Sequence, residues 1–409
     1  LGDVYKRQGH GTSHALLRLL HVAATAQANG QFFACISYDF KKAYDRVPRH
    51  KLVRKLQAMG TPPYLLRFVN NWLTDRRIQV EHRGAFSKPL RTNNGIPQGS
   101  CLSVLLWLVF INDIPILPQD GAIYVDDSLT WVVANSYNSM VDQLHDRASA
   151  IAGWCHSNHV QVNVDKTHIL ANSYNPHLRV TLADGSIIRT TEKLKYLGVH
   201  LYSLPAAAQT CIQLDLTPMA HDIRRRCGIL RSLRYLKIPP RLLRQFALGF
   251  CMGKLRYYTA FLGAETHHKA TLEPLRVSLQ HCMRAILGAF RSTPIPLLHA
   301  ATRLPRIEDM IAADALKTVI MATSRDTLLG KDYHDWDGYG AKWTPLGYAQ
   351  ELLEHIPPSH QSVAVQLPVP HSALEAISAM EFVIPKTIDE AVTLHEKNSL
   401  LSHTHTELW

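Results

Sequence analysis

Three aspartates in this sequence have the residue type and the local context for binding a divalent metal ion. Asp126 and Asp127 are adjacent and follow the apolar residues 123–125, and Asp39 ends a second apolar segment, CISYD. Adjacent carboxylates repel each other unless a cation lies between them, and Mg²⁺ prefers one or two carboxylates together with substrate phosphates. Two strands that bring Asp39 and Asp126 side by side would form the open site that two-metal phosphoryl transfer requires. A solvated turn is the alternative for Asp126 and Asp127 taken alone.

The elements predicted around these acids form a split βαββαβ sheet, so the fold class is α+β. Apolar runs, alternation of apolar and polar residues, and turn residues together predict the elements in chain order. We expect a helix over 14–26, a strand over 32–38, helices over 50–59 and 63–74, a hairpin near 78–82, a buried helix over 100–110, a strand-turn-strand over 122–134, a helix over 139–154, a short strand over 160–164, a hairpin over 179–188 and a strand over 196–201. The acids then fall at the ends of strands.

The second half of the chain has a different composition and a different predicted structure. Residues 217–324 are expected to be helical, with breaks at Pro239-Pro240, Gly263 and Pro294. Beyond them the sequence is broken by prolines and acidic, and it contains no motif or repeat. The chain therefore divides into a mixed α/β part, a helical part and an acidic C-terminal part.

Five sequence blocks carry a resemblance to a known family. They are, in order, SYDFKKAYDRVPRHKL, GIPQGSCLSVLLWLVFINDIP, IYVDDSL, WCHSNHVQVNVDKTHIL and LKYLGV. Together they resemble a reverse transcriptase of the non-LTR retrotransposon type, LINE-type and jockey-like, over about residues 9–325. The resemblance implies a right-hand polymerase, with a palm and partial fingers over 9–204, a helical thumb over 205–325 and a connecting region over 326–409.

The resemblance also implies an activity, RNA-directed DNA polymerase, in which a primer 3′-hydroxyl attacks the α-phosphate of a deoxynucleotide in line. Asp39 and Asp126 would ligate two Mg²⁺ ions, with Mn²⁺ as an alternative ion. Asp127 would support them, and the Phe40 carbonyl would add a backbone ligand. The implied partners are template RNA, primer or target DNA and dNTPs, and the implied location is intracellular, as a ribonucleoprotein of nucleus and cytoplasm. No oligomeric state follows from the sequence.

Further residues match positions where the family contacts the nucleotide. Tyr44 lies where an aromatic side chain under the sugar excludes a 2′-hydroxyl; the alternative is a core aromatic. Gln98 and Gly99 lie where the family contacts the incoming nucleotide and the template base, although Ser100 could instead make this segment an ordinary turn with a helix N-cap. The family usually continues with Leu-Ser-Pro, whereas this chain has Val104 in place of the proline.

Two later segments match positions near the phosphates and the primer. Lys166 would donate a proton to pyrophosphate or fix the phosphates by charge, and a surface lysine is the equal alternative. Tyr196, Leu197 and Gly198 resemble the turn that holds the primer end; a plain hairpin is the alternative. The basic segment IRRRCGILRSLRYLK resembles a thumb helix that follows a template–primer duplex, although basic amphipathic helices also lie on membranes or in solvent.

Composition and charge restrict the function classes. The 44 Lys and Arg against 33 Asp and Glu give a net charge of +11, and residues 331–409 are acidic, so the basic charge belongs to the first 330 residues. This charge favours a polyanionic partner. The longest apolar run is too short to cross a bilayer, so no membrane partner is expected. Seven cysteines contain no CxxC pair, which predicts a reducing compartment and no zinc knuckle.

The ends of the chain and the alternative functions complete the predictions. Residues 1–8, LGDVYKRQ, resemble a translated sequencing adaptor, and we expect the rest to be an internal fragment of a longer protein. The alternative function is a catalytically inactive nucleic-acid-binding remnant of such an element. A cellular polymerase or cyclase palm would share the acids but lack the PQGS and YLG blocks.

Overall fold

The computed structural model describes residues 12–203, 212–262, 269–323, 348–349 and 352. These residues form two compact units. Within the described part, the first unit contains residues 12–15, 30–197 and 203, and the second contains 16–29, 198–202 and the residues from 212 onward. The adaptor-like residues 1–8, the predicted helix break at Gly263 and nearly all of 326–409 lie outside the described residues.

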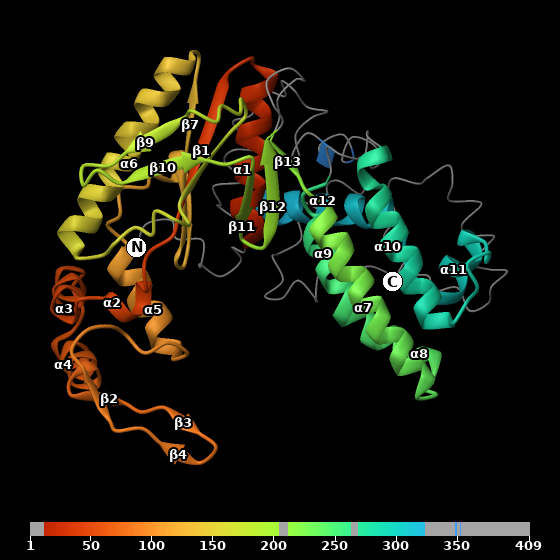
Figure 1. Cartoon of the computed structure of the whole chain (residues 1–409), viewed down its shortest axis with the longest axis horizontal. Helices are drawn as coiled ribbons and strands as arrows, with labels where there is room; N and C mark the ends of the chain where they lie inside the picture. The colour runs from red at the N-terminus through yellow and green to blue at the C-terminus, as the bar shows by residue number, and fades with distance from the viewer. Residues whose placement is uncertain (1–11, 204–211, 263–268, 324–347, 350–351, 353–409) are drawn as a thin grey trace. The chain divides into compact units, whose positions relative to one another are not determined.

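A six-stranded sheet is the centre of the first unit (Figure 1), and its strand order is β6-β7-β1-β8-β10-β9. β1 is antiparallel to both β7 and β8, and β8 is parallel to β10. The strands are β1 (Phe32–Tyr38), β6 (Gly121–Tyr124), β7 (Asp127–Ala134), β8 (His168–Ala171), β9 (Arg179–Thr181) and β10 (Ile187–Thr190). This order confirms the predicted split βαββαβ palm, because the two strands of the acidic hairpin pair beside β1.

Five α-helices of the described residues lie wholly within the first unit. They are α2 (Ala43–Arg46), α3 (Arg49–Ala58), α4 (Pro63–Leu73), α5 (Cys101–Ile111) and α6 (Tyr137–Asn158). The Ser136 side chain caps α6 by accepting a hydrogen bond from the Ser139 amide, at 3.3 Å. Buried residues on one face of α6, including Leu144 and Ile151, pack against β1 and β7 (Figure 1). Burial of this apolar face fixes α6 across the sheet.

A long, narrow hairpin follows α4 (Figure 1). In it β2 (Arg76–Ile78) pairs with β5 (Leu90–Thr92), and β3 (Glu81–His82) pairs with β4 (Ala85–Phe86). The hairpin predicted near 78–82 is therefore confirmed. Three shorter elements complete this half of the chain: η1 (Pro118–Asp120), a 3₁₀ turn before β6; the extended β11 (Lys193–Tyr196); and the turn that follows it.

The second unit is mainly helical. Its elements are α1 (Thr12–Ala28), of which residues 16–28 belong here, β12 (Val199–Ser203), of which residues 199–202 belong here, β13 (Ile212–Leu214), α7 (Thr217–Tyr235), α8 (Pro240–Ala247), α9 (Gly253–Thr259), α10 (Lys269–Leu287), α11 (Ile295–Thr302) and α12 (Ile307–Thr323). A single π-helical turn, Leu248–Met252, joins α8 to α9. α7 packs along α10. None of the described helices combines the length and apolarity that a membrane span needs.

Two local predictions are wrong. The strand expected over 160–164 is reduced to one isolated bridge, between Phe40 and Val162. A turn over 164–166 ends this segment, because the Lys166 and Thr167 amides both donate to the Asn163 carbonyl. The strand lies instead at β8. The strand expected over 196–201 is interrupted after Tyr196 by a turn, which ends β11 before β12 begins. The division into palm, thumb and connecting region remains a prediction.

Candidate active site

The acidic hairpin between β6 and β7 has a two-residue turn. Tyr124 pairs with Asp127, which leaves Val125 and Asp126 at the tip. Val125 has φ of 61°, a conformation that costs a β-branched residue about 1–3 kcal/mol and that such turns usually assign to glycine. Trp107 of α5, which is fully buried, donates a hydrogen bond from Nε1 to the Val125 carbonyl at 2.6 Å. This bond supports the strained peptide that presents Asp126.

Asp39 lies directly after β1, beside the hairpin. Tyr38 pairs with Ser128, so Asp39 and Asp127 are the next residues on neighbouring strands. Asn163 holds Asp39 twice: its Nδ2 donates to Asp39 Oδ2 at 2.8 Å, and its amide donates to the Asp39 carbonyl at 2.7 Å. The Asp39 amide donates to Thr167 Oγ1 at 3.2 Å. The sequence did not predict a role for Asn163, although Lys166 of the same NVDK segment was predicted to act near the phosphates.

The three carboxylates are electrostatically coupled. The pKa of Asp127 is raised, first by loss of solvation and then by the charges of Asp126 and Asp39. The pKa of Tyr44 is also raised, first by burial and then by the negative charge of Asp126. Asp39, Asp126 and Asp127 are thus brought to one place, as predicted from the sequence, and the charges of the first two oppose ionisation of Asp127.

The donor set fits a hard divalent cation, because carboxylate oxygens are the ligands that Mg²⁺ and Mn²⁺ prefer. The Phe40 ring is buried beside Trp107 and Trp154, with centroids 6.4 and 6.3 Å away. No described residue donates a hydrogen bond to the Phe40 carbonyl, which leaves this oxygen available as a ligand.

Tyr44 is half-buried at the start of α2. Its ring stacks on Trp107 at 5.5 Å between centroids and 24° between planes. Its carbonyl accepts a hydrogen bond from the Ile96 amide at 2.9 Å. Tyr44 is therefore packed against the residue that supports the acidic turn, and the Asp126 charge reaches its hydroxyl.

The segment before α5 is held against α2 and α3. Gly95 has φ of +85°, and a Cβ there would lie 2.6 Å from the Asp45 carbonyl oxygen, so only glycine fits. The Arg49 guanidinium donates to the carbonyls of Gly95 and Thr92, at 2.9 and 2.6 Å. These contacts hold the backbone before the PQGS block in place. The sequence did not predict this role for Arg49.

Gln98 and Gly99 are exposed at the end of this segment. Gly99 has φ of +87°, and a Cβ built on it meets no atom within 4 Å. Ser100 occupies the N-cap position of α5, but its side chain makes no capping hydrogen bond. Ser100 therefore has the position of an N-cap residue but not its hydrogen bond. The space beside Gly99 is open, as contact with a nucleotide would require.

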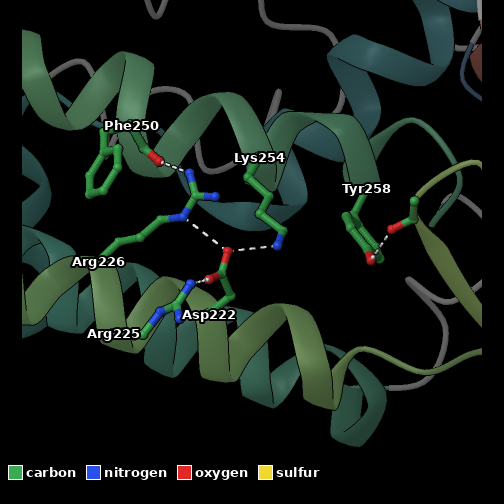
Figure 2. Close-up of polar contacts among 7 residues, drawn as sticks. Asp222, Arg225, Arg226, Phe250, Lys254 and Tyr258 are labelled. Atoms are coloured by element: carbon green, nitrogen blue, oxygen red, sulfur yellow. Dashed lines mark hydrogen bonds and ion pairs between the residues drawn. The ribbon is translucent and has the colours of Figure 1, made fainter. Parts of the chain in front are cut away.

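The contacts described for the remaining predicted residues do not include the three acids. Lys166 is exposed after the Asn163 turn. Tyr196 is buried and ends β11, Leu197 and Gly198 have φ of 46° and 82°, and the boundary between the two units passes between them. The Gly198 carbonyl accepts a hydrogen bond from the Tyr258 hydroxyl at 3.0 Å (Figure 2). The structure leaves the roles of these four residues as predictions.

Known proteins resemble the part of the chain that carries this site. Residues 4–201 match the family model described as reverse transcriptase (RNA-dependent DNA polymerase). The split palm and its three acids lie within the matched residues, which therefore resemble a reverse transcriptase domain. The relatives that match this chain are named as RNA-directed DNA polymerases of mobile elements.

Two relatives and one solved structure illustrate the likeness. A probable RNA-directed DNA polymerase from transposon BS of Drosophila melanogaster is 29% identical over 48% of this chain and 23% of its own length. The RNA-directed DNA polymerase from mobile element jockey of Drosophila funebris is 24% identical over 76% of this chain and 34% of its own. A telomerase structure from Candida tropicalis aligns over 98% of this chain and 55% of its own, at 11% identity and a TM-score of 0.39. The chain thus spans about a quarter to a third of these relatives.

Proposed function

We propose that this chain is an RNA-directed DNA polymerase that copies retrotransposon RNA into DNA. The observation that carries the proposal is the meeting of Asp39, at the end of β1, with Asp126 and Asp127 of the β6–β7 hairpin. The reverse transcriptase match over residues 4–201 supports the same activity. The substrates are template RNA, a primer or target DNA strand and dNTPs.

Asp39 and Asp126 would hold two Mg²⁺ ions, or Mn²⁺, with Asp127 in support and the Phe40 carbonyl as a further ligand. When bound, such ions lower the pKa of the primer 3′-hydroxyl and neutralise the charge that develops on pyrophosphate. Asn163 orients the Asp39 carboxylate through its 2.8 Å hydrogen bond. Trp107 holds the turn that carries Asp126. The chain's own contribution is therefore the position of the two carboxylates before substrate arrives.

The nucleotide would be selected by residues around this centre. Tyr44, half-buried and stacked on Trp107, would exclude a 2′-hydroxyl. Gln98 and Gly99 are exposed and would contact the incoming nucleotide and the template base. Lys166 would supply a proton or a positive charge to the departing pyrophosphate. Tyr196, Leu197 and Gly198 would hold the primer end.

The basic face of α7 would bind the template–primer duplex. Ile223, Cys227 and Leu230 are buried on one side of the helix, whereas Arg224 and Arg231 are exposed. Contacts from these arginines would be to phosphates, and so independent of sequence and weakened by salt. The complex of this chain with its template RNA, a ribonucleoprotein, would act inside the cell, in the cytoplasm and the nucleus.

Primer extension on poly(rA) with oligo(dT), dTTP and Mg²⁺ tests the proposal. We expect the parent chain to extend the primer and Asp126→Asn to lose extension. Asp146→Asn, an exposed acid on α6, is the matched control and should retain it. Extension that survives Asp126→Asn contradicts the proposed site. RNA binding by the parent without extension would favour the alternative, a nucleic-acid-binding remnant.

A further inference from the structure

Three cysteines that are far apart in the sequence meet inside the second unit. Cys227 comes from α7, Cys251 from the π-helical turn and Cys282 from α10. Each is at most 1% exposed, and their sulfur atoms all lie within 4.8 Å of one another. Among the described residues, no other three potential metal ligands come so close. We call these residues the thiol cluster.

Two of the three elements that carry the thiol cluster, α7 and the π-helical turn, are joined by a polar network that also includes Lys254 of α9 (Figure 2). Arg226 donates from Nη1 to the Phe250 carbonyl at 2.5 Å and from Nε to Asp222 Oδ2 at 2.9 Å. Lys254 Nζ donates to the same Asp222 oxygen at 2.6 Å. Arg226 precedes Cys227 and Phe250 precedes Cys251 in the sequence, so the network fixes the backbone beside both thiols. A π-helical turn is rare and is found frequently at functional sites.

Apolar packing and a disulfide explain the thiol cluster less well than a metal ion does. A buried cysteine often serves as a small apolar residue, but that role does not require three sulfurs to converge from three elements. A disulfide would join two of them and leave the third, and all three are free thiols.

We propose that Cys227, Cys251 and Cys282 bind a soft, thiophilic metal ion, with Zn²⁺ as the ion of choice, that joins α7, the π-helical turn and α10. Thiolate ligands select such ions over Mg²⁺. On binding, each thiol releases its proton to solvent and donates a sulfur lone pair to the metal, with no change in oxidation state. Zn²⁺ usually takes four ligands, so the fourth comes from outside the cluster. The site is structural and separate from the carboxylates of the palm.

Titration of the reduced, metal-free chain with Co²⁺ under anaerobic conditions tests this site. We expect one equivalent to produce a thiolate-to-cobalt charge-transfer band in the near ultraviolet, and Zn²⁺ to abolish it. Co²⁺ bound by the palm aspartates gives no such band, because their ligand atoms are oxygen. Cys227→Ala and Cys282→Ala should each weaken binding by at least about tenfold. Cys155→Ala, a buried cysteine outside the cluster, is the matched control and should leave the band unchanged.

Two results would overturn the proposal. The first is a parent chain that shows no charge-transfer band, a result that does not depend on how any variant folds. The second is a band that persists in both ligand variants, which would assign it to other thiols. Thermal unfolding provides a separate measurement: Zn²⁺ should raise the Tm of the parent and of Cys155→Ala, and leave that of Cys282→Ala unchanged.

Discussion

The Trp107 indole donates a hydrogen bond to the Val125 carbonyl, with 2.6 Å between Nε1 and the oxygen. This bond joins the helix that follows the PQGS block to the turn that presents Asp126. The same indole stacks on Tyr44. One buried side chain therefore contacts both the acidic turn and the residue proposed to select the sugar, so its loss should affect the chemistry as well as the stability of the fold.

Trp107→Phe retains an aromatic ring and removes the donor. We expect the free energy of unfolding to fall by about 1–2 kcal/mol, because the Val125 carbonyl loses its partner. We also expect kcat for primer extension to fall more than KM changes, since Asp126 is less well positioned. Urea unfolding and steady-state extension measure the two effects. Trp131→Phe is the matched control, because Trp131 donates an equivalent bond to the Gln119 carbonyl at 2.9 Å, away from the acids. Equal losses of kcat in the two variants would disprove the positioning role.

Asn163→Ala removes the hydrogen bond to the Asp39 carboxylate. The freed carboxylate should bind metal less well, and the Mg²⁺ concentration for half-maximal extension should rise by about tenfold. Asn175→Ala, which loses a bond of the same length to the Tyr137 hydroxyl, serves as the comparison and should not change the Mg²⁺ dependence. A lower maximal rate at unchanged Mg²⁺ dependence would show that Asn163 acts in some other way.

Asp127→Asn should stabilise the metal-free protein at neutral pH. The pKa of Asp127 is raised in the folded state, so ionisation opposes folding above that pKa, and the penalty fades as pH falls toward the ordinary carboxyl range near 3.8. Urea unfolding of the parent and of Asp127→Asn across this pH range measures the penalty. Asp184→Asn should change the free energy of unfolding in the opposite direction and destabilise the protein at neutral pH. Hydrogen bonds from Ser186 lower the pKa of Asp184, so its charge favours folding. Destabilisation by Asp127→Asn at neutral pH would contradict the coupling of the acids.

Tyr44→Ala should admit ribonucleotides. Removal of the ring opens space at the sugar, and discrimination between dTTP and UTP should fall by about tenfold or more. Tyr44→Phe retains the ring and its stacking on Trp107, and should retain discrimination. Single-nucleotide incorporation with each substrate measures the ratio. Unchanged selectivity in Tyr44→Ala would assign this residue to packing alone.

The sequence predicted the elements whose pattern is local and missed the contacts that depend on the fold. A continuous apolar, aromatic run was enough to predict β1, and the apolar segments around the two adjacent acids were enough to predict the hairpin, so Asp39 and Asp126 were found. The segment around Asn163 looked like a strand because its apolar residues alternate, but its backbone hydrogen bonds turn it toward Asp39. The indole bond of Trp107 and the meeting of Cys227 with Cys282 could not be read from spacing, because both depend on how helices pack.

The central claim is that Asp39 and Asp126, from two strands, act as one catalytic centre. Single-turnover incorporation of one dTMP should be measured for Asp39→Asn, Asp126→Asn and the double variant at saturating Mg²⁺. Residues that act as a unit are not additive, so each single variant should lose on the order of a thousandfold or more and the double variant should lose little beyond either. Losses that multiply in the double variant, or a single variant that retains the parent rate, would contradict the claim.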